Sequence, residues 1–226
     1  MAGAALEALG GASYDPDVAT AAYRRAGLSE EEANARAWHR GRLQLERAIA
    51  EGTDYAFETT LGGRTITGLL QRAAEAGHRV RMWYVGLDTV ERHLERVRAR
   101  VARGGHDIPE DKIRERWDAS RKNLVRLLPV LAELRLFDNS IEGAPEEGRA
   151  PRPRLLLHMK ASKVSFVARP DDVPVWAKPI VAAALGASFE HLVGALGDDP
   201  SLPEDLSARH DHYLYGDPRD VGPNAD

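Results

Sequence analysis

The sequence contains no cysteine, so disulfide bonds and thiolate chemistry are excluded, and a zinc site would have to rest on histidine and carboxylate side chains. No apolar run approaches the roughly 20 residues that a membrane-spanning helix needs, and we expect no membrane partner. The first residues, MAGAALEALGGASYDPD, carry no basic stretch ahead of their small apolar run, which is unlike a secretory signal. Together these absences predict a protein of the reducing cytoplasm.

Lysine is scarce as well, supplying only 5 of the 31 basic residues, whereas arginines crowd between Arg92 and Arg126. The planar guanidinium fork suits bidentate contact with phosphate oxygens. The alternative is a GC-rich genome that favours arginine codons, with these side chains on solvated helix faces. The formal net charge of −4 argues against non-specific nucleic-acid binding, so we expect no nucleic-acid partner.

What is present fits an ordinary globular protein. The chain has 226 residues, of which 43% are hydrophobic and 29% charged, enough for one α/β domain with a full core or for a domain plus an appendage. Apolar periodicity and capping residues predict helices over 17–26, 29–51, 66–76, 89–103 and 112–134, the last interrupted at Pro129. Strands are predicted in DYAFETT, RVRMWYVGL and LRLFDNS. This alternation predicts a mainly parallel sheet with flanking helices.

Two of the predicted strands end in polar residues. The first delivers Glu58, Thr59 and Thr60, and the third delivers the run from Asp138 to Ser140. In parallel sheets ligands bind at the carboxyl ends of the strands, so the pattern indicates a site at this edge. The alternative is that these residue types merely favour turns and helix caps.

The last third of the chain gives a weaker signal. LLLHM and SKVSFVA are strand candidates, a helix is predicted over 174–196, and the remaining tail is rich in Asp, Pro and Gly. We therefore expect a core over 1–145 with a helical lid at about 88–128, C-terminal strands and a helix of the same domain over 146–198, and a loosely ordered tail over 199–226.

Several short motifs occur in a telling order: FETTLGGRT, then RVRARVARGGHDIPEDKIRERW, then Asn123-Leu124, then LFDNS. In this order they resemble the zeta-toxin-like family of small P-loop kinases, over about residues 40–140. In that family a strand ending in ETT leads into a helix, an arginine-rich lid with a GGH turn closes over the nucleotide, and a later strand ends in DNS.

The resemblance implies ATP-dependent phosphoryl transfer to the hydroxyl of a sugar nucleotide or similar small molecule, with ATP and Mg²⁺ as cofactors. UDP-N-acetylglucosamine is the best-known family substrate, and an antitoxin protein is an expected partner. Phosphoryl transfer needs positioning of the reactants and neutralisation of the phosphate charge, so mobile arginine side chains that cover the phosphates are expected.

Carried onto this sequence, the resemblance assigns nucleotide binding to Arg100, Arg103 and Arg116, on the two sides of the GGH turn. Arg100 and Arg103 share one face of the first lid helix, together with Arg96. The alternative for each arginine is a surface salt bridge. Glu58, Thr59 and Thr60 are assigned to the substrate or Mg²⁺ edge; for Glu58, capping of the following segment is the alternative.

No catalytic residue and no resident metal site is assigned. We interpret His106 as a residue that fixes the turn rather than as a catalytic base, because a base must be held still. Asp138 and Asn139 either approach the adenine side or cap the next segment.

The chain departs from the family at its most characteristic element. It has no G-x-x-x-x-G-K-[ST] loop, and none of its lysines follows a glycine. Without the first strand and this loop, an apolar gap and unpaired edges are expected in the sheet. A coding sequence that begins too late, a degenerate relative, or a strand supplied by another chain would each account for this, and we favour the first.

Three functions follow from these patterns. The leading one is the kinase, inactive or incomplete as this chain. The second is a non-catalytic nucleotide- or partner-binding protein of a toxin–antitoxin-like system. The third, with the least support, is nucleic-acid binding through the arginine-rich stretch.

Overall fold

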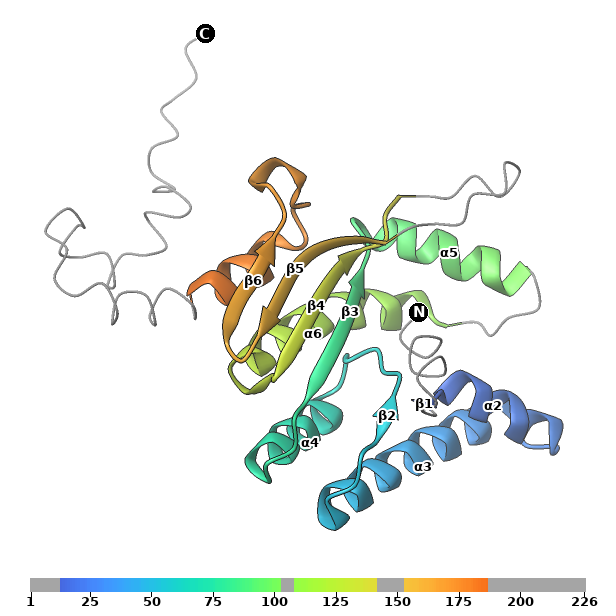
Figure 1. Cartoon of the computed structure of the whole chain (residues 1–226). Helices are drawn as coiled ribbons and strands as arrows, with labels where there is room; N and C mark the ends of the chain where they lie inside the picture. Colours follow the sequence, from blue (N-terminus) through green and yellow to red (C-terminus); the bar gives the residue numbers. More distant parts are fainter. Residues whose placement is uncertain (1–12, 103–107, 142–152, 187–226) are drawn as a thin grey trace, which may run out of the picture. The chain divides into compact units, whose positions relative to one another are not determined.

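The computed structural model of the chain describes residues 13–102, 108–141 and 153–186, and all of them belong to one unit that spans residues 1–188. This part of the chain is an α/β structure in which helices alternate with short strands (Figure 1). The first half contains β1 (Ser13–Tyr14), α2 (Pro16–Arg25), α3 (Glu30–Glu51), β2 (Ala56–Phe57) and α4 (Arg64–Glu75). The second half contains β3 (Arg81–Gly86), α5 (Val90–Ala102), α6 (Glu110–Leu127), the 3₁₀ turn η1 (Leu128–Val130), β4 (Glu133–Asp138), β5 (Arg154–Lys160), β6 (Lys163–Val167), the turn η3 (Pro170–Asp172) and a helix whose described part covers 178–186.

The helix boundaries follow from local chemistry. Ser29 and Glu32 form the predicted capping box at the start of α3, each side chain bonding the other residue's backbone N–H. Gly52 ends the helix with a left-handed φ of 69°, a conformation that costs glycine little. The interruption predicted at Pro129 is confirmed, since α6 gives way there to η1.

The strands form two sheets rather than the single, mainly parallel sheet expected. β1 and β2 pair in parallel, and the second sheet has the order β3-β4-β5-β6. In that sheet β3 and β4 are parallel, whereas β4–β5 and β5–β6 are antiparallel. The prediction of a mainly parallel sheet was therefore wrong for the C-terminal strands, because β5 and β6 are joined by a two-residue turn that only an antiparallel pair permits.

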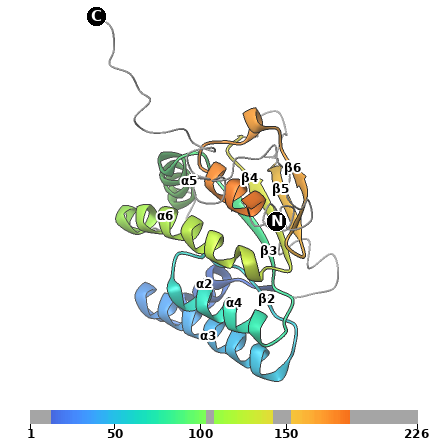
Figure 2. The ribbon, with the colours of Figure 1, turned by 90° about the vertical axis from the view of Figure 1, so that its left-hand side faces the viewer.

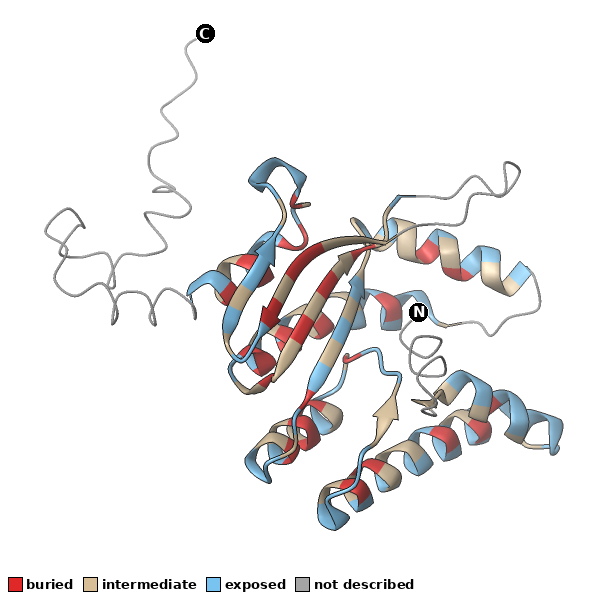
Figure 3. Cartoon of the chain, in the orientation of Figure 1, coloured by how far each residue is buried: buried red, intermediate tan, exposed pale blue. Residues whose placement is uncertain are grey.

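The helices gather on one side of the strands. Figure 2 shows α3, α4 and α6 on the same side, and the buried faces of β4 and β5 pack against that layer. The core contains fully buried leucines from α6 and the strands, including Leu124, Leu127, Leu134 and Leu156. Figure 3 shows the sheet from the opposite side. Exposed and intermediate positions alternate along β3, buried and intermediate positions alternate along β4, and β5 contains three buried positions.

The segment after β6 returns to the end of β3. Trp176 is 5% exposed, and its ring lies so close to Gly86 that a Cβ at this position would collide with it. Tyr84 packs beside the same indole, with ring centroids 6.3 Å apart. Glycine is therefore required at the carboxyl end of β3.

Within the described ranges, none of the helices combines the length and the apolarity needed to cross a bilayer.

Candidate functional site

The loop that follows β2 carries three of the predicted site residues. Glu58, Thr59 and Thr60 are all exposed there. The Thr59 hydroxyl accepts a hydrogen bond from the Leu61 N–H at 3.1 Å, which closes a local turn. Leu61 is buried and holds a positive φ of 53°, so the chain reverses sharply between the polar run and α4.

One face of α6 holds this loop in place. Arg116, Ser120 and Asn123 lie four and three residues apart and so share that face. The Asn123 amide donates to the Leu61 carbonyl at 2.8 Å, and the side chain of Arg116 lies against Gly62. Two positions of the loop are thus fixed by the second helix of the predicted lid.

The same face of α6 also contacts the larger sheet. The hydroxyl oxygens of Ser120 and Tyr84 are 2.9 Å apart, and burial raises the pKa of Tyr84 despite this hydrogen bond and the nearby Arg121. Because Ser120 lies between Arg116 and Asn123 along this face, α6 links the loop after β2 to strand β3.

Helix α5 reaches the carboxyl end of β4. Arg96 donates to the backbone carbonyl of Asn139 at 2.8 Å. Arg100 forms a salt bridge with Asp17 of α2, 3.4 Å between Nη1 and Oδ2. Burial, together with the charges of Arg100 and Arg96, lowers the pKa of His93 below its usual range. Arg96 therefore lies at the carboxyl end of β4, while Arg100, one turn further along α5, is paired with α2.

The arginines between Arg92 and Arg126 differ in what they contact. Among the described residues, five of them pair with carboxylates, as the alternative interpretation expected: Arg92 with Asp88, Arg98 with Glu110, Arg100 with Asp17, Arg114 with Glu91 and Glu110, and Arg121 with Asp118. Arg116 is exposed and has no carboxylate partner among the described residues. Its guanidinium is thus available to an anion at this edge.

Not every predicted residue can be placed. Arg103 and His106 lie outside the described residues, so their roles stay predictions. Asp138 is buried, accepts hydrogen bonds from the backbone and hydroxyl of Ser140, and pairs with Arg154 at 3.5 Å. These contacts favour the capping interpretation of Asp138.

The two lid helices have an apolar core of their own. Leu94 and Val97 of α5 pack with Ile113 of α6, and partly buried Val90, Val101 and Ile108 surround them. This cluster is separate from the main core, so α5 and α6 form a helical hairpin with its own packing; its role as a lid stays a prediction.

Sequence reasoning missed the structural roles of Ser120 and Asn123. The signal was present, because both polar residues fall within the apolar stripe of α6 that includes Ile113, Leu124 and Leu127. A buried polar residue in such a stripe needs a partner, and here the partners are the loop after β2 and strand β3.

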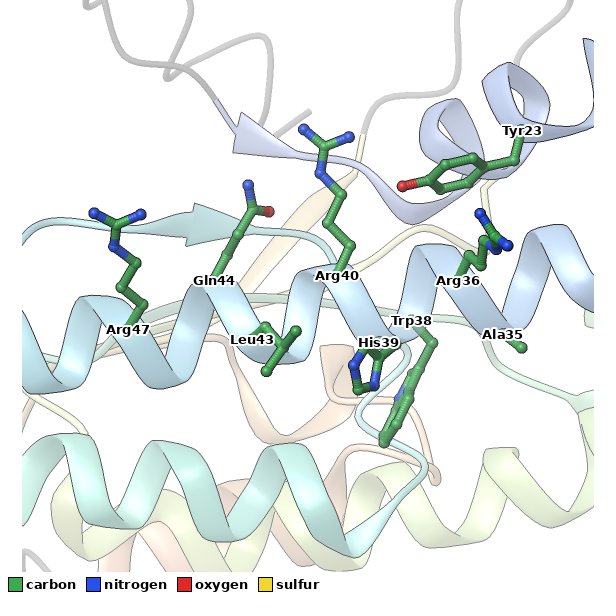
Figure 4. Close-up of a pocket in the computed structure, with 9 residues that line it drawn as sticks. All are labelled: Tyr23, Ala35, Arg36, Trp38, His39, Arg40, Leu43, Gln44 and Arg47. Carbon is green, nitrogen blue, oxygen red and sulfur yellow. The ribbon is translucent and has the colours of Figure 1, made fainter. Parts of the chain in front are cut away.

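A shallow hollow lies elsewhere, along α3 next to Tyr23 of α2 (Figure 4). Arg36, Arg40 and Arg47 lie on its Tyr23 side, and the exposed Trp38, which also lines the hollow, extends on the opposite side of α3 in the close-up. None of the predicted site residues lines this hollow, and we assign it no role.

No three histidine, aspartate or glutamate side chains come together as a metal site in the part of the chain that the structure describes. Glu58 is the exposed carboxylate at the strand edge.

Comparisons with known proteins add one partial similarity. No family model matches the chain, and no solved structure matches it. An uncharacterised protein of Haemophilus influenzae is 39% identical over 70 residues, which are 31% of this chain and 50% of that protein. The chain therefore matches only about half the length of this curated relative, and the resemblance to the zeta-toxin-like kinases stays a prediction.

Proposed function

We propose that the chain binds the phosphate groups of ATP between the α5–α6 hairpin and the loop after β2, as the lid and acceptor part of a zeta-toxin-like phosphotransferase. The reaction would transfer the γ-phosphoryl group of ATP to the hydroxyl oxygen of a sugar nucleotide or similar small molecule, releasing ADP and a proton. The observation that carries the proposal is the position of Arg116, which lies against Gly62, two residues beyond Thr60, and has no carboxylate partner among the described residues.

The electrostatics of the edge support an anionic ligand. Arg96 and Arg100 stand one turn apart on α5, and their charges help to lower the pKa of the neighbouring His93. A polyphosphate placed among these groups would reverse that effect, because an anion favours the protonated imidazole. Arginine is also the side chain best suited to bidentate phosphate contact.

Magnesium would enter with the nucleotide. Mg²⁺ sites in phosphoryl-transfer enzymes commonly use one or two carboxylates together with the substrate phosphates, and Glu58 fits the role of such a carboxylate. The ion would neutralise charge that develops on the phosphoryl group. Thr59 and Thr60 would present hydroxyl groups to the acceptor or to the phosphates.

The test of nucleotide binding compares two arginines of the same helix. Arg116→Ala should weaken ATP binding by about tenfold or more, the equivalent of about 1.4 kcal/mol. Arg114→Ala should leave it unchanged, because Arg114 is already paired with Glu91 and Glu110. Isothermal titration with ATP and Mg²⁺ measures both. Equal affinities of the two variants would overturn the proposed position of the phosphates.

A second readout needs no mutation. NMR titration of the histidine ring protons should show the pKa of His93 rising when ATP is added. An unchanged pKa in the presence of saturating ATP would contradict binding beside Arg96 and Arg100.

Transfer is tested separately from binding. Since the chain has no G-x-x-x-x-G-K-[ST] loop, turnover requires that this loop be supplied, and a coupled assay of ADP release with UDP-N-acetylglucosamine would detect it. ATP binding without turnover across a panel of sugar nucleotides would favour the second candidate, a non-catalytic nucleotide- or partner-binding protein of a toxin–antitoxin-like system. The missing loop is the observation that favours this candidate.

A further inference from the structure

The larger sheet has a face that points away from the core, which we call the outer face. Registered residues on neighbouring strands point to the same side of a sheet, so the register defines cross-strand rows on this face. In the order β3, β4, β5 and β6, the charged row is Arg81, Glu133, Lys160 and Lys163, and the aromatic row is Trp83, Arg135, His158 and Phe166. None of these side chains belongs to the buried core.

The aromatic row ends in an exposed ring on each side. Trp83 is 36% exposed and Phe166 is 44% exposed. Between them lie two further planar side chains, Arg135 and His158, and the Cζ of Arg135 lies 5.8 Å from the centroid of the Trp83 ring. A row of exposed planar groups on a sheet is a surface on which flat ligand groups can stack.

The charged row carries cations without counter-charges. Arg81, Lys160 and Lys163 are exposed, and none of them has a carboxylate partner among the described residues. Their side chains are therefore available to an anionic ligand.

Glu133 is the single carboxylate in the two rows, and it is already paired. It accepts hydrogen bonds from Arg135 at 2.9 Å and from His158 at 3.0 Å. Burial raises the pKa of Glu133, but the hydrogen bonds from His158 and Arg135 outweigh this effect and hold the pKa below its ordinary range. The outer face is thus positive, although the whole chain is not.

The formal net charge of −4 is a sum over all 226 residues. The expectation of no nucleic-acid partner rested on that sum. Where a polyanion binds is decided by the local distribution of charge, so a basic face on an acidic chain is still a site for one.

We propose that the outer face binds single-stranded nucleic acid, with bases stacked on the aromatic row and phosphates held by the charged row. The bases of a duplex are stacked on one another, whereas those of a single strand are free to stack on exposed rings. Trp83 and Phe166 are three strand spacings apart, about 14 Å, so a ligand that covers both is an oligonucleotide rather than a single nucleotide. This inference goes beyond the proposed function and does not depend on it.

A second copy of the chain fits this face less well. In a two-fold contact the same patch meets itself. The unpaired cations of one copy would then lie near those of the other, and like charges that face each other are destabilising.

The first test measures binding of the full chain to labelled oligonucleotides of about twelve nucleotides, by fluorescence anisotropy at low salt. Oligouridine and oligothymidine distinguish RNA from DNA, and a DNA duplex of the same length is the control. At least one single strand should bind about tenfold or more tightly than the duplex. Equal affinities, or no binding of either single strand, would overturn the proposal.

Matched variants test the stacking. Trp83→Leu and Phe166→Leu should each weaken binding by about tenfold or more, while Trp83→Phe, which keeps a ring, should retain most of the affinity. Trp38→Leu is the control, because Trp38 is half exposed but lies on α3. If Trp83→Leu and Trp83→Phe bound alike, stacking on this row would be ruled out.

Salt dependence tests the phosphate contacts. Lys163→Gln should reduce the slope of log affinity against log salt concentration by roughly one. Lys122→Gln, at an exposed position of α6, should leave the slope unchanged. The same slope in both variants would contradict the role of the charged row.

The position of the strand is tested by photocross-linking to an oligonucleotide that contains 5-bromouridine. Cross-links at Trp83 or Phe166 would support the proposal. Cross-links confined to α5 or α6 would assign binding to the arginine-rich stretch instead and overturn it. Analytical ultracentrifugation provides the last check, since a dimer that Trp83→Leu converts to a monomer would make the outer face a self-association surface.

Discussion

At the scale of single residues, two adjacent glycines, Gly62 and Gly63, allow the contact between Arg116 and its loop to be tested. Only one of them lies against the Arg116 side chain. A Cβ at Gly62 would lie 2.7 Å from the Cγ of Arg116, whereas one at Gly63 would meet nothing within 4 Å. Gly62→Ala should therefore destabilise the fold by roughly 1–3 kcal/mol, as overpacking does, and weaken ATP binding. Gly63→Ala should do neither. Urea denaturation measures the first effect and ATP titration the second; indistinguishable variants would mean that Arg116 does not rest on this loop.

His93 gives a second prediction at this scale, concerning pH. Its pKa in the folded chain is below the ordinary value of 6.5, because of burial and the charges of Arg100 and Arg96. Below pH 6.5 the unfolded chain therefore takes up the proton more readily, and the free energy of unfolding falls as the pH drops through the folded pKa.

The variant His93→Gln should lose less stability than the parent between pH 7.5 and pH 5.5, because glutamine takes up no proton in either state. Urea midpoints at the two pH values check this. Equal losses in parent and variant would show that the imidazole titrates alike in the folded and unfolded chains.

At the scale of elements, the α5–α6 hairpin has a small core that is separate from the main one. Leu94→Ala should cost about 2–5 kcal/mol locally, so hydrogen exchange should accelerate in α5 while the β4–β5 ladder stays protected. Leu134→Ala removes a fully buried leucine of the main core and should accelerate exchange throughout. Global acceleration by both variants would mean that the hairpin does not open on its own.

At the scale of the whole molecule, the sequence predicted the order and type of most elements but not how the strands pair. Capping residues and glycines, such as Ser29 and Gly52, end a helix through contacts with residues next to them in the sequence. The helix ends could therefore be predicted. The direction of β5 and β6 depends on how β5 pairs with β4. The alternation of apolar and polar residues within a strand is the same for parallel and antiparallel pairing, so the sequence did not predict it. The division of the described strands into two sheets was not predicted from the sequence either.

The candidate site was predictable only in part, for the same reason. The motifs indicated one edge of the sheet as a site, which stays a prediction, and they did not distinguish Arg116 from arginines that form salt bridges. That distinction depends on partners that are distant in the sequence. Arg100 pairs with the Asp17 carboxylate, 83 positions away, and Arg96 donates to the Asn139 carbonyl, 43 positions away. Likewise, the buried amide of Asn123 is explained only by a loop 62 positions earlier in the chain.

The Trp176 indole, which packs on Gly86, can serve as an intrinsic fluorescent probe of this region. Of the four tryptophans, Trp176 is the most deeply shielded, whereas Trp38 is half exposed. A soluble quencher such as acrylamide should therefore spare the Trp176 emission and suppress that of Trp38. Any event that shifts the tip of β3 against Trp176 would then change the protected fraction of the fluorescence.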